Sequence, residues 1–158
     1  MNDVTDRPNR LPWPPIVYLT AIGVSLVLNA FYPLPWFGQP LSGILFVLGW
    51  LMIAAFITLN FTAIRAMRRA GTTVRPDRGT DHLVTGGPFA FTRNPLYLAG
   101  IMLVLGLGLA FGIAWFLLVG IPAAFAVQKL TIEREERHLE ARFGETYLDY
   151  ARRVRRWI

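Results

Sequence analysis

Two long stretches without a charged side chain, residues 11–64 and 94–128, dominate the hydrophobic pattern of the chain. Each is much longer than the ~20 apolar residues that cross a bilayer as a helix. A soluble core does not require uncharged runs of this length. The pattern therefore predicts an all-α integral membrane protein.

Turn-forming residues divide both stretches into shorter helices. The proline-rich segment YPLPWFGQP, residues 32–40, interrupts the first stretch, because proline cannot continue a helix. One straight helix over 94–128 would be ~52 Å long, against a hydrocarbon core of ~30 Å. We therefore expect the second stretch to fold into a helical hairpin that turns near Gly112. The four predicted transmembrane helices are 13–31, 41–64, 95–110 and 113–130.

The distribution of basic residues tests this count independently. All 16 lysines and arginines fall in segments 1–10, 65–93 and 129–158. Four spans place these segments on one side of the membrane, as the positive-inside rule expects. We therefore predict a single membrane domain in the cytoplasmic (inner) membrane, with both termini cytoplasmic. The loop 65–94 and the C-terminal helical region 131–158 would lie on the same side.

The amino-acid composition restricts the classes of molecule that the protein can bind. The net charge of +6 fits attraction to anionic membrane lipids, and no nucleic-acid-binding module is visible. The chain has no cysteine, which excludes disulfides, thiolate catalysis and Cys-type zinc sites. Residues 135–138 form one Glu-x-x-His, whereas a di-iron bundle needs two. We expect neither nucleic acid nor metal as a partner.

The two polar regions that flank the hairpin differ in pattern. The loop 65–94 lacks helical periodicity over most of its length, and the apolar residues in it indicate that it packs: Leu83, Val84, Phe89 and Phe91. The region after the hairpin is helical in pattern, with an arginine-rich opposite side. We predict an amphipathic helix on the membrane surface. Its apolar stripe would consist of Phe143, Tyr147, Tyr150, Val154 and Trp157.

Three motifs carry a resemblance to a known family. HLVTGGPFAFTRNPLYLAG, then a hairpin and IEREERHLEARFGETYLDYARRV, resemble the C-terminal half of the isoprenylcysteine carboxyl methyltransferase family. Phospholipid N-methyltransferases are broader relatives. The family pattern is Arg-His-Pro-x-Tyr, a Glu-Glu pair, and Phe-Gly-x-x-Tyr-x-x-Tyr, here over about residues 72–156. The matching residues are Arg93, Pro95, Tyr97, Glu135, Glu136, Phe143, Gly144, Tyr147 and Tyr150.

The resemblance implies an integral membrane methyltransferase that uses S-adenosylmethionine. It implies catalytic roles for Arg93, Asn94 and Glu136. The family has a histidine where this chain has Asn94, which puts a proton-transferring role there in doubt. The implied cofactor-binding residues are His82, Val84, Gly87, Phe91, Arg93, Asn94, Pro95, Tyr97, Glu135, Glu136 and Tyr147.

The residue types suit this cofactor. An arginine can hold its carboxylate with a forked pair, and a glutamate can hold its ammonium. Tyr97 and Phe91 offer aromatic faces for the adenine or the sulfonium. A pocket at the membrane surface would admit a small or lipidic methyl acceptor from the bilayer at the cytoplasmic face.

Other interpretations of these residues stay open. Asn94-Pro95 is also a plain helix start, and Arg93 may be read as an interfacial side chain. The glutamates of 133–140 also fit a solvated helix. Adjacent helix positions differ by ~100°, so the sequence does not decide whether Glu135 or Glu136 faces the site. The alternative functions are an NADPH-dependent membrane reductase of the sterol-reductase type and a non-catalytic membrane scaffold.

The charge asymmetry generates a test of topology. The connection that contains Gln39 should lie outside, opposite all 16 basic residues. A cysteine introduced at Gln39 is then the only thiol in the chain, so labelling reports its side directly. We expect an impermeant reagent to label it from outside. Labelling only from the cytoplasm would refute the topology.

Overall fold

The computed structural model describes residues 12–71 and 82–158, where all regular structure is helical. This confirms the expected all-α class. The elements are α1 (Trp13–Phe31), α2 (Leu41–Arg69), the 3-10 helix η1 (Gly87–Ala90), α3 (Pro95–Phe111), α4 (Ala114–Val127), the π-helix η2 (Gln128–Ile132), α5 (Glu133–Phe143) and α6 (Glu145–Arg153).

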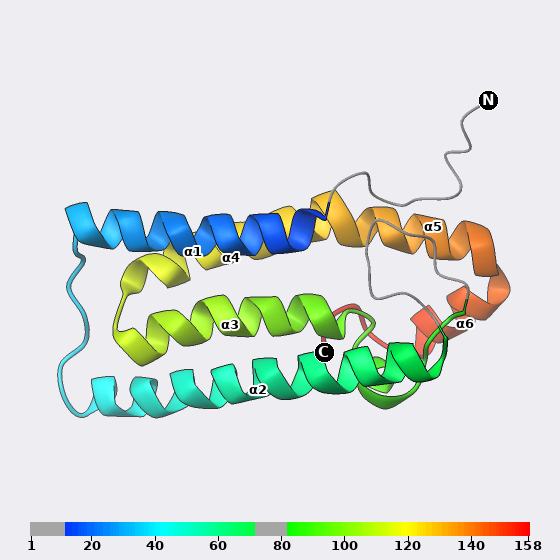
Figure 1. Ribbon diagram of the computed structural model, residues 1–158, viewed down its shortest axis with the longest axis horizontal. Helices are drawn as coiled ribbons and strands as arrows, with labels where there is room; N and C mark the ends of the chain where they lie inside the picture. The colour runs from blue at the N-terminus through cyan, green and yellow to red at the C-terminus, as the bar shows by residue number, and fades with distance from the viewer. Residues whose placement is uncertain (1–11, 72–81) are drawn as a thin grey trace.

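The four longest elements form an elongated bundle. The α3 helix lies at its centre, packed against α2 on one side and against α4 on the other, while α1 packs on α4 (Figure 1). The α4, η2 and α5 elements follow one another as one long rod, which extends beyond the N-terminal end of α3. The chain then reverses through α6, and the C-terminus returns to the start of α3 (Figure 1). This return brings the last residues to the N-terminal end of the central helix.

Three helices of the described ranges are long and apolar enough to cross a membrane: Trp13–Phe31, Leu41–Arg69 and the continuous Ala114–Phe143. The apolar α3 is shorter, with 17 residues. At ~1.5 Å per residue it spans ~26 Å, slightly less than a hydrocarbon core. The protein is thus an integral membrane protein, and the fourth span and the side of the termini stay predictions. The segment 1–10 and loop residues 72–81 lie outside the described residues.

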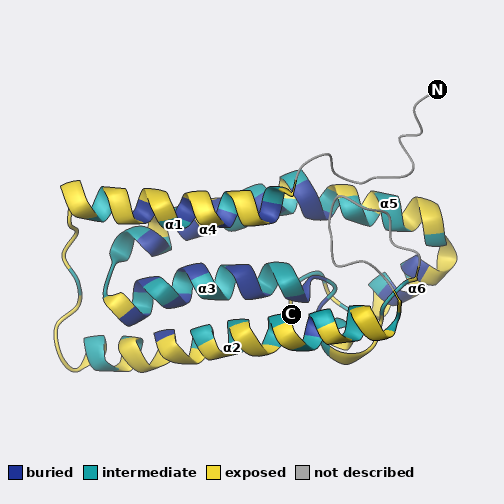
Figure 2. Cartoon of the chain, viewed as in Figure 1, coloured by how far each residue is buried: buried dark blue, intermediate teal, exposed yellow. Residues whose placement is uncertain are grey.

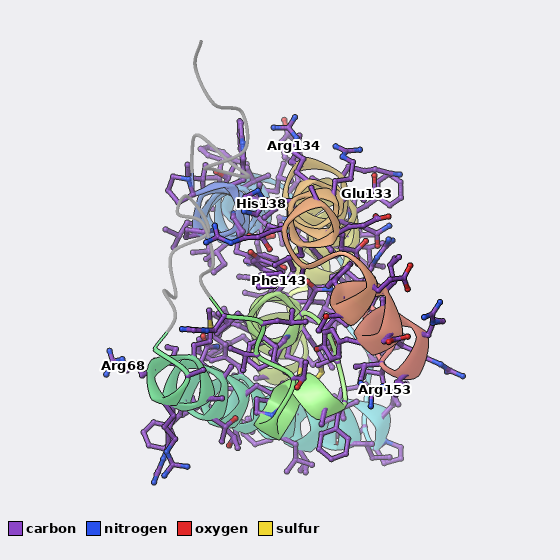
Figure 3. All side chains as sticks on the ribbon, turned by 90° about the vertical axis from the view of Figure 1, so that its right-hand side faces the viewer. Arg68, Glu133, Arg134, His138, Phe143 and Arg153 are labelled. Carbon is purple, nitrogen blue, oxygen red and sulfur yellow. The ribbon has the colours of Figure 1, made fainter. Side chains whose placement is uncertain are left out.

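The outward faces of α1 and α2 are apolar. Leu19 is 68% exposed, Phe61 64% and Ile57 59%, whereas α3 is mostly buried or half-buried (Figure 2). Apolar surface on this scale marks contact with a membrane or a partner. Figure 3 looks onto the end of the bundle where the labelled polar residues of α2, α5 and α6 gather, among them Arg68, Arg134 and Arg153. Lipid-facing walls and one charged end fit a protein embedded in a bilayer.

The hairpin predicted near Gly112 is present. Gly112 adopts a left-handed conformation with φ of 68°, which favours glycine and ends α3. The Ile113 N–H donates to the Gly108 carbonyl at 2.9 Å across the turn. A side chain at Gly108 would place its Cβ 2.7 Å from the Phe116 Cβ, so glycine lets α4 begin close to α3.

Two helices continue beyond the predicted transmembrane spans. The second helix continues to Arg69 instead of stopping at residue 64, because arginine favours helix as much as most apolar residues do. The fourth does not end at residue 130, since the chain passes from α4 through η2 into α5 without a break. In both helices the charged residues bound the predicted span, but the helix itself continues through them.

The single amphipathic surface helix predicted for the C-terminal region is also not what the structure has. Gly144, with φ of 51°, separates α5 from α6, and residues 154–158 are not helical. Tyr147 and Tyr150 of the expected membrane-facing stripe are buried within the protein, with 3% and 4% exposure. The aromatic stripe therefore docks α6 onto the bundle.

Backbone contact between α2 and α3 yields a prediction about stability. A Cβ added at Gly49 would lie 2.8 Å from the Gly106 carbonyl oxygen, which belongs to rigid helix backbone. Gly49→Ala should therefore lower the free energy of unfolding by about 1–3 kcal/mol, the usual cost of overpacking. Thermal unfolding in detergent measures this.

Gly23→Ala in α1 is the matched control, because nothing lies within 4 Å of its Cβ position. This control should gain up to about 1 kcal/mol from helix propensity. Equal stability of the two variants would contradict close α2–α3 packing.

Candidate functional site

The start of α3 is held by the C-terminal tail. The Arg93 N–H donates to the Arg155 carbonyl at 3.0 Å. The Arg156 carbonyl accepts two more hydrogen bonds, from Asn94 Nδ2 at 3.0 Å and from Thr92 Oγ1 at 3.1 Å. Three consecutive residues thereby bind two consecutive carbonyls. The tail fixes the backbone on which Arg93 and Asn94 stand.

Asn94 has a different role from a side-chain cap. It does precede α3, and Pro95 is the first helical residue, as the helix-start interpretation predicts. Its side chain nevertheless makes no capping hydrogen bond, because the amide donates to the tail instead. Asn94 is 8% exposed and thus largely removed from solvent. Asn94 thus stands at the N-cap position, as the helix-start interpretation predicts, but its side chain makes a tertiary contact and no capping bond.

The Glu136 carboxylate of α5 is the centre of the charged cluster. Arg156 binds it with a fork, from Nε to Oε1 at 3.0 Å and from Nη2 to Oε2 at 2.6 Å. Arg93 Nη1 lies 3.2 Å from Glu136 Oε1. The side chains of Arg93 and Glu136 are each 16% exposed. Charge-assisted pairs of this geometry are stronger than neutral hydrogen bonds. The paired carboxylate raises the pKa of Arg156, first through the hydrogen bonds between them.

Two tyrosines of α6 complete this side of the cluster. Arg93 Nη1 donates to Tyr147 Oη at 3.0 Å, and Tyr150 Oη donates to the Phe89 carbonyl at 2.7 Å. Burial, together with the Glu136 carboxylate, raises the pKa of Tyr147. Burial also raises the pKa of Tyr150 to about 12. Both phenols therefore keep their protons at neutral pH and serve as neutral hydrogen-bonding groups.

Glu135 and Glu136 both face the start of α3, but with different partners. Tyr97 Oη donates to Glu135 Oε1 at 2.7 Å, and Tyr18 Oη donates to the Tyr97 carbonyl at 2.9 Å. Glu135 is half-buried and has no arginine partner among the described residues, whereas Glu136 has two. The sequence left open which of the two glutamates faces the site. In the structure both do: Glu135 contacts a phenol, and Glu136 contacts two guanidinium groups.

The cluster keeps unused hydrogen-bonding capacity. Arg93 Nε is buried without a hydrogen-bond partner within the described part of the chain, and so is the Thr131 hydroxyl of η2. A buried polar atom without a partner is costly, and such atoms often mark ligand positions. Arg93 can therefore offer Nε to a carboxylate while its Nη1 stays on Glu136. The residues present fit a zwitterionic ligand with one carboxylate and one ammonium.

The remaining predicted site residues lie before the cluster along the chain. Val84 is half-buried, His82 and Gly87 are exposed, and the hydrogen bonds around Glu136 do not extend to them in the described ranges. Gly87 faces α2, since an added Cβ would lie 3.7 Å from Ala66. Phe91 is 78% exposed, so the expectation that it packs was wrong. The structure brings together Arg93, Asn94, Pro95, Tyr97, Glu135, Glu136 and Tyr147.

Sequence reasoning missed Arg156 and Thr92. Arg156 stands in an arginine-rich run, RRVRRW, where no spacing distinguishes it from its neighbours. Thr92 is buried to 3% exposure beside Asn94, and its hydroxyl would have been visible only as a polar residue next to the motif. Thr92 donates to a backbone carbonyl of the tail, and the Arg156 guanidinium reaches Glu136 because the tail reverses. A sequence pattern encodes neither contact.

The described residues contain no group of three His, Cys, Asp or Glu side chains that could hold a metal ion. The side chains that meet at this cluster are instead arginines, glutamates and neutral tyrosines. This set suits recognition of a charged organic molecule.

The fold and this cluster define a helical membrane protein with a charged cluster at one end of its bundle. Residues 44–146 match the family described as phospholipid methyltransferase. The match covers more than half of the chain, which therefore belongs to the phospholipid methyltransferase family. This confirms the resemblance, because the isoprenylcysteine carboxyl methyltransferase-like membrane enzymes fall within that family. Membership indicates a membrane methyltransferase. No curated protein sequence matched the chain.

The amide of Asn94 provides a test of the tail contact. Asn94→Asp replaces the donor with a carboxylate that faces the Arg156 carbonyl. The carbonyl keeps the Thr92 hydroxyl as a donor but loses the amide and faces a carboxylate instead, so we expect a loss of about 1–3 kcal/mol in the free energy of unfolding. Hydrogen exchange at residues 154–158 should also become faster. Thr146→Asp adds the same charge at an exposed position of α6 and is the control. Unchanged exchange in Asn94→Asp would show that the amide does not hold the tail.

Proposed function

We propose that this protein is an S-adenosylmethionine-dependent methyltransferase that acts on a small or lipidic acceptor at the cytoplasmic face of the membrane. The observation that carries the proposal is the buried Arg93–Glu136 pair at the start of α3, with Arg93 Nε still without a partner among the described residues. Family membership supports the reaction class. The cluster supports the kind of cofactor.

In this proposal, different residues of the cluster bind different groups of the cofactor. Arg93 holds its carboxylate through the unused Nε. Glu135 or Glu136 holds the ammonium, and Glu135 is the better placed for this, since no arginine of the described ranges pairs with it. Tyr97 and Tyr147 supply aromatic faces and phenol groups beside these charges. Pro95 and Asn94 fix the backbone at the start of α3.

His82, Val84, Gly87 and Phe91 form the outer part of the proposed site. They precede the cluster on the segment that carries η1, and the exposed Phe91 ring is free to cover a bound adenine. In this arrangement the closure of the site comes from a segment that packs on α2, while its charged base comes from α3 and α5.

Methyl transfer from a sulfonium requires of the protein mainly that it position the reacting atoms. When bound, S-adenosylmethionine supplies the methyl group from its sulfonium. The side chains orient the reacting atoms and exclude water, which accounts for much of the rate of an in-line displacement. Asn94, in place of the family's histidine, does not transfer a proton at neutral pH. A pre-activated acceptor therefore suits this site best, and it enters from the bilayer beside α3.

Ligand binding in detergent tests the proposal. The purified protein should bind S-adenosylhomocysteine and ignore NADPH, whereas a reductase would do the reverse and a scaffold would bind neither. Arg93→Ala and Glu136→Gln should each weaken S-adenosylhomocysteine binding by about 1–3 kcal/mol, the range for hydrogen bonds to charged groups.

Arg134→Ala removes an exposed arginine of α5 and is the control for charge. Thermal unfolding identifies the variants that remain folded. Wild-type affinity in folded Arg93→Ala and Glu136→Gln proteins would show that the pair is structural only.

A further inference from the structure

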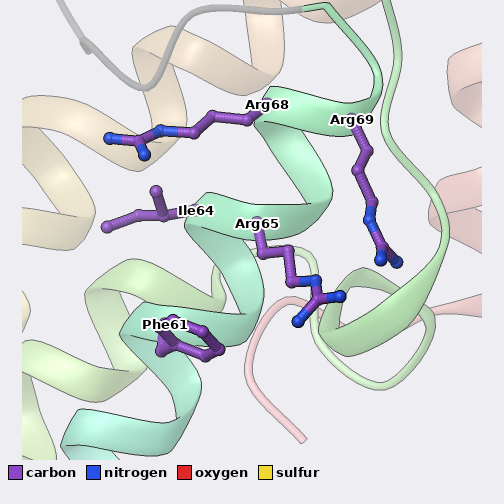
Figure 4. A pocket seen from close by; sticks show the side chains of 5 residues that line it. All are labelled: Phe61, Ile64, Arg65, Arg68 and Arg69. Atoms are coloured by element: carbon purple, nitrogen blue, oxygen red, sulfur yellow. The ribbon is translucent and has the colours of Figure 1, made fainter.

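A second basic site lies at the C-terminal end of α2, apart from the Glu136 cluster. An open surface cavity of about 500 Å³ is lined there by Phe61, Ile64, Arg65, Arg68 and Arg69, all of which belong to α2 (Figure 4). In Figure 4, Arg65 and Arg69 extend to one side of α2 and Arg68 to the other. None of these residues belongs to the Glu136 cluster.

The three arginines of this cavity, which we call the α2 arginine group, have no acidic partner within the described residues. Arg65, Arg68 and Arg69 are exposed, and none makes an ion pair or side-chain hydrogen bond with another residue of the described ranges. Like charges three and four residues apart destabilise a helix. The α2 sequence has no acidic residue to offset them. The geometry therefore favours an anion with several oxygens, for which guanidinium groups are the preferred partners.

The apolar part of the cavity shows what else the ligand carries. Phe61 is 64% exposed and continues the apolar outer face of α2, on which Ile57 is 59% exposed. This helix is long and apolar enough to cross a membrane. The arginines thus stand where the apolar face ends. A ligand that satisfies both parts has an anionic head and a long apolar chain.

We propose that Arg65 and Arg69, which extend to the same side of α2, bind the phosphate of an anionic membrane lipid, while Arg68 adds its charge from the other side. The acyl chain lies along Phe61, which is four residues before Arg65, and along the outer face of α2. This site is distinct from the proposed methyl-transfer site and goes beyond the proposed function. A free phosphate would use the arginines alone and would leave Phe61 without a role. A bound lipid would fix the end of α2 in the headgroup layer, beside the η1 segment that packs on it.

Short-chain lipids test this on the full-length protein in neutral detergent. Native mass spectrometry would measure the binding of dioctanoyl phosphatidylglycerol, dioctanoyl phosphatidylcholine and inorganic phosphate. We expect the anionic lipid to bind at least about tenfold more tightly than the other two probes. The triple variant Arg65→Gln/Arg68→Gln/Arg69→Gln should lose that preference.

Two matched variants separate the proposal from simpler explanations. The triple variant Arg134→Gln/Arg137→Gln/Arg153→Gln removes the same charge from other exposed positions and should keep wild-type lipid binding. Phe61→Ala should weaken binding of the anionic lipid several-fold and leave inorganic phosphate unaffected.

Three results would overturn the proposal. Equal losses in the two triple variants would reduce the effect to net charge. Inorganic phosphate binding as tightly as the lipid would make the cavity a site for free anions. Equal binding of the anionic and zwitterionic lipids would leave the arginines without a role. S-adenosylhomocysteine binding by the same variants reports separately on the methyltransferase proposal.

Discussion

The pairing of the Glu136 carboxylate with two arginines joins three parts of the chain that are far apart in sequence. Glu136 stands on α5, Arg93 precedes α3, and Arg156 follows α6. Because Arg93 and Glu136 are both largely buried, removing the carboxylate would leave the charge of Arg93 uncompensated in a poorly solvated place. The position of the tail, the direction of α6 and the backbone at the start of α3 all depend on this interaction.

The bundle determines where that interaction can form. Glycines let α2, α3 and α4 approach closely, and this leaves the short central α3 with its N-terminal end beside the first turns of α5. Apolar surface elsewhere on α1 and α2 faces outward. The charged cluster and the arginines of α2 are therefore both confined to one end. A water-soluble cofactor and a membrane-borne acceptor, as we propose, would meet at such a boundary.

Several features of the fold could be predicted from sequence because they arise from local patterns. The uncharged stretches predicted the helices, and glycine predicted the turn at Gly112. The pattern failed where a helix changes its winding or direction. Nothing in the sequence marks the π-helix Gln128–Ile132, and the regular spacing from Phe143 to Trp157 suggested one helix although Gly144 breaks it. Apolar residues spaced three and four apart indicate one face of a helix. This spacing does not reveal whether the helix axis changes direction within the segment.

The sequence by itself determined that this protein is a helical membrane protein with charges at one end, and it determined the family to which the chain belongs. Both properties follow from the order of residue types along the chain. Only the tertiary structure decided the partners: Glu135 with Tyr97, Glu136 with Arg93 and Arg156, and Asn94 with the tail carbonyl. The physical reason is that each pair joins residues that meet only after the hairpin closes and the tail reverses, so no local pattern records them.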